Sequence, residues 1–245
     1  MSTLLERIEW DAAKRLVLPP GRLPAQELPR YQRFRKVEYQ WLKRLHRAGA
    51  GGREICQARA AVLDVLLRHL LETVLASCPP GAARLLPAVT LVALGGYGRR
   101  ELNPHSDLDL MFLHDGSLVS GDQPHSLWRA LSRHLLYTLY DTGLTVGYSI
   151  RTPAECVEAA QSDLRTKTSL IEARWLAGDA SLFQAMTATV LHHCVEGFEA
   201  DYIAARLEDQ AVRRAKFGNS ACLLEPNIKN GCGGLRDYQN LLWMA

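Results

Sequence analysis

The sequence predicts an α/β protein in which a small sheet is flanked by helices. Three short runs of apolar and β-branched residues are bounded by glycine, proline or other turn residues, which is typical of strands. They cover residues 89–94, 108–113 and 144–150, and an apolar repeat of helical period lies between the last two at residues 124–141. The order strand, turn, strand, helix, strand is that of an α/β fold.

The chain before the first strand is predicted to be a linker followed by two helices. Four prolines fall within residues 16–30, which favours an extended connector there. Residues 31–48 are helical in pattern, and the sequence GAGG ends that helix before a second one over residues 53–77. Apolar residues recur every three to four positions along the second helix, so one of its faces is expected to be buried.

The chain from residue 152 onward is predicted to be mainly helical. Helices are expected over residues 153–163, 167–178 and 198–217. The resulting division has three parts: an N-terminal segment and linker over residues 1–30, a core with its preceding helices over 31–151, and a helical region over 152–245.

Composition excludes several classes of protein. The 245 residues are 47% hydrophobic and 22% charged, as in ordinary globular proteins, and the net charge of +3 lacks the concentrated basic excess of a nucleic-acid binder. The six cysteines form no C-x-x-C pair, so neither a zinc site nor a disulfide framework is expected. The first 15 residues contain acids, and no uncharged apolar stretch could cross a bilayer, so we expect a cytoplasmic protein without a membrane partner.

The segment LVALGGYGRRELNPHSDLDLMFL, residues 91–113, holds the residues with the clearest chemistry. Asp107 and Asp109 are two apart on a predicted strand, so both carboxylates project from one face while the leucines between and beyond them pack inward. Two carboxylates held side by side repel each other. Such a pair usually binds a divalent cation, and Mg²⁺ prefers oxygen ligands of this kind.

The glycines of this segment follow directly on the first strand. Gly95, Gly96 and Gly98 lack a Cβ, so backbone N–H groups can approach phosphate oxygens, above all if a helix begins near Arg99. Arg99 and Arg100 would supply positive charge. Either motif alone is weak evidence, but together they predict nucleotidyl transfer, with metals on the paired carboxylates assisting displacement at phosphorus. A P-loop and a G-x-G-x-x-G motif are both absent.

The stretch GGYGRRELNPHSDLDL resembles the signature of the polymerase β-like nucleotidyltransferases, which implies a small mixed sheet flanked by helices. Its particular residue pattern is similar to that of the bifunctional uridylyltransferase/uridylyl-removing enzymes, which modify the nitrogen-regulatory PII protein. The stretches VGYSIRTPAEC, DLRTKTSLIEARWLAGD and EPNIKNGCGGLRDYQNLLW resemble later blocks of that family in the same order. The resemblance covers roughly residues 31–245.

The resemblance implies roles for particular residues. Gly95 and Gly96 would contact the triphosphate of UTP, and Arg99 would neutralise phosphate. The metals would lie on Asp107 and Asp109, with Ser106 orienting the turn or touching phosphate. In the superfamily a third carboxylate from a neighbouring strand completes the metal site, yet residues 144–150 contain no acid. Glu172 is the preferred substitute and Asp163 the second choice, although a glutamate on an amphipathic helix is most often a surface residue.

A second dense polar cluster lies in LEPNIKNGCGGLRDYQ, residues 224–239. It could line the nucleotide pocket, in which case Lys229 and Arg236 are the candidates for binding phosphate. The alternative is a helix-capping turn, with Asp237 near a helix N-terminus and the glycines serving turn geometry. The sequence does not separate these two interpretations.

The leading hypothesis is Mg²⁺-dependent transfer of UMP from UTP to a tyrosine of a PII protein. One alternative is a related nucleotidyltransferase with another acceptor or with ATP as donor. Another is a nucleotide-binding pseudo-enzyme, which the missing strand carboxylate favours. The hydrolase and ligand-sensing domains of the resembling enzymes do not fit within 245 residues, so this chain is expected to be either a fragment or a truncated gene product, in both cases without uridylyl removal or glutamine sensing.

Overall fold

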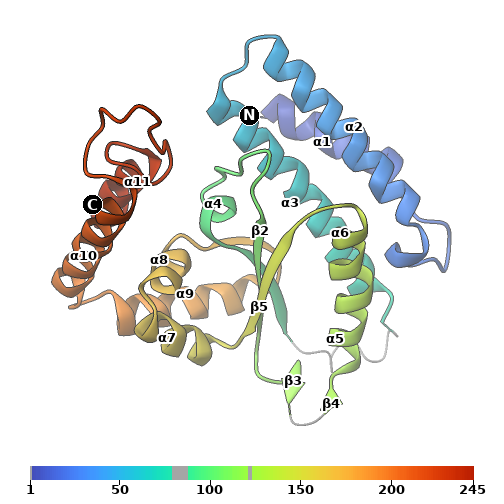
Figure 1. The fold of residues 1–245 in the computed structure, drawn as a ribbon. Helices are drawn as coiled ribbons and strands as arrows, with labels where there is room; N and C mark the ends of the chain where they lie inside the picture. The colour runs from blue at the N-terminus through green and yellow to red at the C-terminus, as the bar shows by residue number, and fades with distance from the viewer. Residues whose placement is uncertain (1, 79–87, 121–122) are drawn as a thin grey trace.

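The computed structural model describes residues 2–78, 88–120 and 123–245, and its centre is a four-stranded mixed sheet (Figure 1). The strand order is β5-β2-β1-β6. Strand β1 (Val89–Ala93) runs antiparallel to both β2 (Leu108–His114) and β6 (Arg174–Gly178), whereas β2 runs parallel to β5 (Val146–Arg151). The three predicted strands are therefore confirmed, as is the α/β class.

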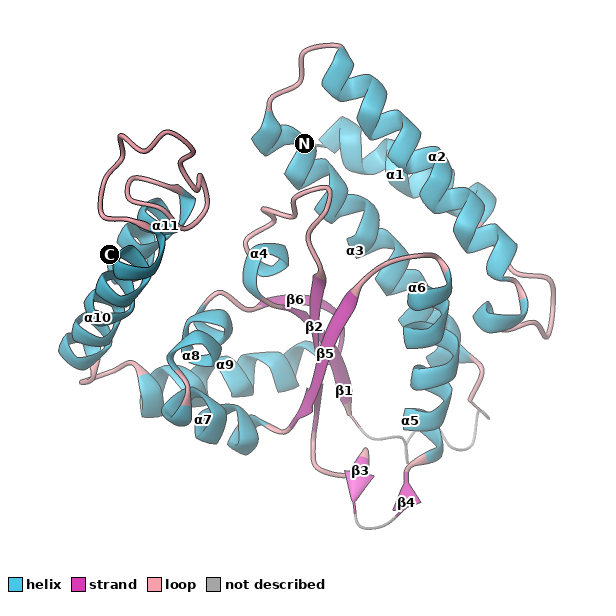
Figure 2. Cartoon of the chain, in the orientation of Figure 1, coloured by secondary structure: helices cyan, strands magenta, loops and turns pink. Residues whose placement is uncertain are grey.

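Helices cover both faces of the sheet (Figure 2). Helix α3 (Gly52–Ala76) lies on one face with a helical stretch formed by α5 (Ser126–Leu131), the π-helical η3 (Ser132–Leu136) and α6 (Tyr137–Asp141). Helices α7 (Pro153–Ser162) and α9 (Ala180–Cys194) lie on the other. All five residues of β1 are buried because both faces of this central strand are covered.

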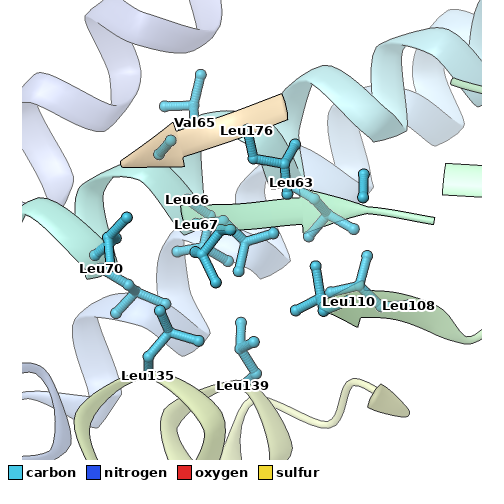
Figure 3. Close-up of a cluster of buried hydrophobic side chains, with 14 of the residues drawn as sticks. Leu63, Val65, Leu66, Leu67, Leu70, Leu108, Leu110, Leu135, Leu139 and Leu176 are labelled. Atoms are coloured by element: carbon cyan, nitrogen blue, oxygen red, sulfur yellow. The ribbon is translucent and has the colours of Figure 1, made fainter. Parts of the chain in front are cut away.

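The alternation of β2 separates two hydrophobic clusters. Leu108 and Leu110 point into the larger cluster, where they meet leucines of α3, η3 and α6 (Figure 3). Met111 and Leu113 point into the smaller cluster, which α7 and α9 cover. The helix predicted over residues 124–141 is confirmed, except that it begins at Ser126 because Gln123–Pro124 forms strand β4, paired with β3 (Val119–Ser120).

The N-terminal part differs from the prediction of an extended connector. Helix α1 (Ser2–Arg15) precedes the proline-containing segment, which then contains the 3₁₀ turn η1 (Pro24–Gln26) and leads into α2 (Leu28–Arg47). Two of its four prolines, Pro24 and Pro29, stand within the first two positions of these helical elements, where a missing N–H costs nothing. A bidentate hydrogen-bonded ion pair between Arg7 and Glu38, at 2.7 and 3.2 Å, joins α1 to α2.

The C-terminal part is mainly helical, as predicted. It comprises α7, α8 (Leu164–Ile171), α9, α10 (Glu199–Phe217) and α11 (Leu235–Met244). The single helix predicted over residues 167–178 is wrong, because α8 ends at Ile171 and Arg174–Gly178 pairs with β1 as β6. A short apolar run is compatible with either a helix or a strand. Here the run forms a strand because it hydrogen-bonds to the edge of β1 that β2 leaves free. No helix in the described part of the chain is long and apolar enough to span a membrane.

Candidate functional site

The glycine motif forms a single helical turn, α4 (Gly95–Gly98), directly after β1. Gly95 has a φ of 55°, which turns the backbone away from the strand direction. The turn begins at Gly95 and has Arg99 as its C-cap, so the helical turn at this motif precedes Arg99 instead of beginning near it. The first N–H groups of such a turn have no partner within it, so those of Gly95 and Gly96 are the ones open to an anion.

The two aspartates lie at the same end of the sheet as this turn. Asp107 immediately precedes β2 and Asp109 is within it, and both are exposed while Leu108 between them is buried. The backbone N–H of Leu94 donates to the carbonyl oxygen of Asp109 at 3.0 Å, which fixes the glycine turn beside the acidic strand. The predicted arrangement of both carboxylates on one face of β2 is thus present.

Two glycines leave space around the Asp109 carboxylate. A Cβ built on Gly95 would lie 3.3 Å from Oδ2, and one built on Gly147 would lie 3.2 Å from Oδ1. Although the residue as a whole is exposed, partial desolvation of its carboxylate beside Gly95 and Gly147 raises the pKa of Asp109, and the charge of Asp107 raises it further. A carboxylate in this position, with a second one beside it, is a donor set that suits Mg²⁺.

Strand β5 is the neighbour that would supply a third carboxylate, and it supplies none. Gly147 pairs with Asp109 in the β2–β5 register, and Ser149 pairs with Met111. The Ser149 hydroxyl is buried without a hydrogen-bond partner among the described residues. Within the same part of the chain, no three His, Cys, Asp or Glu side chains are grouped to hold a metal ion.

Glu172, the candidate third ligand, contacts Arg99. It follows α8 as its C-cap, and its Oε2 accepts a hydrogen bond from Arg99 Nη1 at 2.6 Å. Its Oε1 accepts one from the indole Nε1 of Trp243. Burial raises the pKa of Glu172, while Arg99 and Trp243 act in the opposite direction. The second choice, Asp163, caps the N-terminus of α8 by accepting from the N–H of Thr166 at 2.7 Å.

Arg99 lies over the glycine turn. A Cβ on Gly96 would be 3.8 Å from its Nη2, and its Nε donates to Glu101 at 2.8 Å. Two carboxylates thus hold the guanidinium beside the backbone that is expected to bind phosphate. This is the position that the sequence hypothesis gives to a phosphate-neutralising cation.

Ser106 lies in the loop that leads to Asp107, and an arginine missed by the sequence analysis contacts that loop. Ser106 N donates to Asn103 O at 3.0 Å, and Arg59 Nη2 on α3 donates to Ser106 O at 3.4 Å. Burial lowers the pKa of Arg59, and its Nη1 is buried without a hydrogen-bond partner in the described residues. Arg59 could have been identified from the sequence by its position, because it stands four residues after the buried Ile55 in an apolar helical stripe.

The backbone N–H of Arg236 donates to the carbonyl oxygen of Lys229 at 2.9 Å, but the two side chains differ in exposure. Lys229 is exposed in the loop before α11. Arg236 is half-buried, donates to Gln239 at 3.0 Å and lies 5.2 Å from the ring centroid of Trp243. Burial lowers the pKa of Arg236, and the positive charge of Arg99 lowers it further. Arg236 and Arg99 are therefore close enough to interact electrostatically.

Asp237 has a structural role, as in the interpretation of this segment as a helix-capping turn. It accepts from Gly233 N at 2.9 Å and forms ion pairs with Arg213 at 2.7 Å and Arg214 at 3.0 Å. Burial favours its neutral form, but the Gly233 amide and the Arg213 guanidinium outweigh burial and hold the pKa of Asp237 well below its usual range. The carboxylate therefore fastens the loop before α11 to α10.

We expect Asp237→Asn to loosen α11. The loss of two ion pairs from a nearly buried carboxylate should cost about 2 kcal/mol. Because the folded-state pKa is depressed, the stabilisation is full above the ordinary aspartate pKa and fades as the pH falls through the folded-state value. Hydrogen exchange of the amides of residues 235–244 at neutral pH measures the effect. Glu208→Gln, at an exposed position of α10, is the control, and equal exchange in both variants would contradict the expectation.

Comparison with known proteins finds similar sequences. A family model described as GlnD PII-uridylyltransferase matches residues 201–245. A protein of Novosphingobium aromaticivorans is 36% identical over 204 residues, which are 83% of this chain and 22% of that protein. One from Rhodospirillum rubrum is 36% identical over 195 residues, 79% of this chain and 20% of the relative. One from Azotobacter vinelandii is 42% identical over 157 residues, which are 64% of this chain and 17% of that protein.

These three proteins carry the name bifunctional uridylyltransferase/uridylyl-removing enzyme. The chain spans about a fifth of their length.

Proposed function

Because this chain is homologous over most of its length to one part of the bifunctional uridylyltransferase/uridylyl-removing enzymes, we propose that it transfers UMP from UTP to a tyrosine of a PII-type protein. The single observation that carries the proposal is the juxtaposition of the glycine turn with Asp107 and Asp109 at one end of the sheet. A nucleotide donor and a signalling-protein acceptor are both consistent with a cytoplasmic enzyme.

The residues at this end of the sheet suit the parts of a nucleoside triphosphate. The Gly95 and Gly96 amides and the Arg99 guanidinium would bind the phosphates and orient them for in-line attack. Asp107 and Asp109 would hold Mg²⁺, which when bound supplies charge neutralisation at the reacting phosphorus. The acceptor hydroxyl needs a base, and Asp109, whose carboxylate lies between Gly95 and Gly147, is the candidate.

One observation favours a second candidate function, nucleotide binding without transfer. The position opposite Asp109 on β5 is Gly147, and Glu172 is engaged by Arg99 and Trp243. Two carboxylates can still hold a metal, since a bound triphosphate supplies further oxygen ligands. The two candidates therefore differ in turnover rather than in binding.

Incubation of the purified chain with a PII protein, MgCl₂ and either UTP or ATP separates the candidates. Intact-mass analysis should show PII gaining one UMP per subunit with UTP and nothing with ATP. A gain of AMP would instead identify a related nucleotidyltransferase that uses ATP. No gain with either nucleotide, when calorimetry still detects magnesium-dependent UTP binding, would favour the non-catalytic candidate.

A further inference from the structure

Trp243, in the last turn of α11, lies among charged groups rather than in an apolar core. Its indole N–H donates to Glu172 Oε1. Three guanidinium groups lie near its ring, with their Cζ atoms at 4.8 Å for Arg206, 5.2 Å for Arg236 and 5.8 Å for Arg99. An arginine within about 6 Å of an indole centroid is attracted to the ring face. A tryptophan that served packing alone would not need this set of neighbours.

The three arginines around Trp243 are held differently. Arg206 is buried and fully engaged, because it donates to Asn240 at 2.9 Å, to Thr168 at 3.2 Å and to Asp209 at 2.7 Å. It anchors α10 against α8 and α11. Each of its three nitrogens already donates to an oxygen of the protein, so this arginine is structural.

Arg99 and Arg236 are the two that remain for a ligand. Arg99 lies over the glycine turn, where Glu101 and Glu172 hold it. Arg236 has no ion pair with a carboxylate in the described part of the chain, and its hydrogen bond goes to the neutral Gln239. The charge of Asp209 also acts on Arg236, but Asp209 is paired with Arg206. A half-buried guanidinium without a carboxylate of its own is costly unless an anion completes its surroundings.

We propose that Trp243 is a positioning residue of the nucleotide site, and that α11 completes the site for the polyphosphate of a nucleoside triphosphate. Its N–H fixes Glu172, which fixes Arg99 beside the glycine turn, and its ring holds Arg236 in the same neighbourhood. The proposal rests on the proposed function for the identity of the ligand. It joins the segment that the family model matches, residues 201–245, to the glycine and aspartate motifs at residues 95–109.

Calorimetric titration of UTP with MgCl₂ tests the proposal in Trp243→Leu and Trp243→Phe. We expect Trp243→Leu to weaken UTP binding about tenfold, which corresponds to one lost charge-assisted interaction. Trp243→Phe keeps a ring under the guanidinium groups but loses the N–H donor, so it should restore part of the affinity. Leu241→Ala, at an exposed position of the same helix, is the control for general damage to α11.

A cycle with Arg99→Gln supplies a readout that a purely structural tryptophan would not affect. If the Trp243 N–H acts through Glu172 and Arg99, the double variant Trp243→Phe, Arg99→Gln, which keeps a ring beside Arg236, should bind UTP no more weakly than Arg99→Gln alone. Unchanged UTP affinity in a folded Trp243→Leu variant, or losses that simply add, would overturn the proposal, and so would a wild-type chain that binds no UTP. A wild-type chain that binds UTP but transfers nothing to PII contradicts only the proposed transfer, since the calorimetric test needs no turnover.

Discussion

Asp107→Asn is expected to lower nucleotidyl transfer roughly a thousandfold, because a bound metal contributes several kcal/mol of charge stabilisation and asparagine cannot replace a carboxylate that holds it. The side chain of Asp107 is exposed at the start of β2. The fold should therefore survive the substitution. Transfer to PII, measured by mass with UTP and MgCl₂, gives the rate, and circular dichroism gives the fold. Asp141→Asn, at an exposed aspartate of α6, is the matched control.

Asp109→Asn is expected to show the same loss of transfer together with a gain in stability. Burial and the neighbouring Asp107 raise the pKa of Asp109, so its charged form is disfavoured in the folded chain. A carboxyl whose pKa is higher in the folded state than in the unfolded state makes stability fall as the pH rises between those two values. At neutral pH the metal-free Asn variant should thus melt at a higher temperature. Full activity of either variant would remove the pair from the site.

The sequence predicted the elements whose evidence is local. The β2 alternation, the turn after β1 and the apolar stripe of α3 each lie within a few neighbouring residues, and the structure confirms them. The strand β6 was missed because its formation depends on the edge of β1, about 80 residues earlier. Local propensity cannot represent such a pairing.

The candidate site shows the same division between local and distant information. Asp107 and Asp109 could be placed together from their spacing alone. Glu172 could be identified as a relevant acid but not assigned a contact, because its partners Arg99 and Trp243 are 73 and 71 residues away in the sequence. Arg59, whose place depends on the packing of α3 against the Ser106 loop, was not singled out.

Gly98→Ala is expected to be the most damaging substitution within the glycine motif. A Cβ on Gly98 would lie 2.5 Å from the carbonyl oxygen of Glu172 and 3.1 Å from that of Ala93. Both obstacles are backbone atoms, so no side-chain rotation can relieve the contact. Moving them displaces the end of β1 and the residue that holds Arg99. We expect a loss of about 3 kcal/mol in the free energy of unfolding, at the upper end for overpacking, and impaired UTP binding.

Gly96→Ala is the matched comparison, two residues earlier in the same turn. Its Cβ would meet the carbonyl oxygen of Glu101 at 3.5 Å, an ordinary contact, and alanine is a better helix former than glycine. The unfolding midpoint of the variant should therefore lie at a denaturant concentration at least as high as that of the wild type. Its methyl group, beside Arg99 and the approaching phosphate, should weaken UTP binding. Denaturant unfolding and UTP titration of both variants decide the matter. If Gly98→Ala were as stable as Gly96→Ala, the close packing of α4 on Glu172 would be wrong. A less stable Gly98→Ala, with weakened UTP binding in both variants, would show that Gly98 makes room for the protein backbone and Gly96 for the nucleotide.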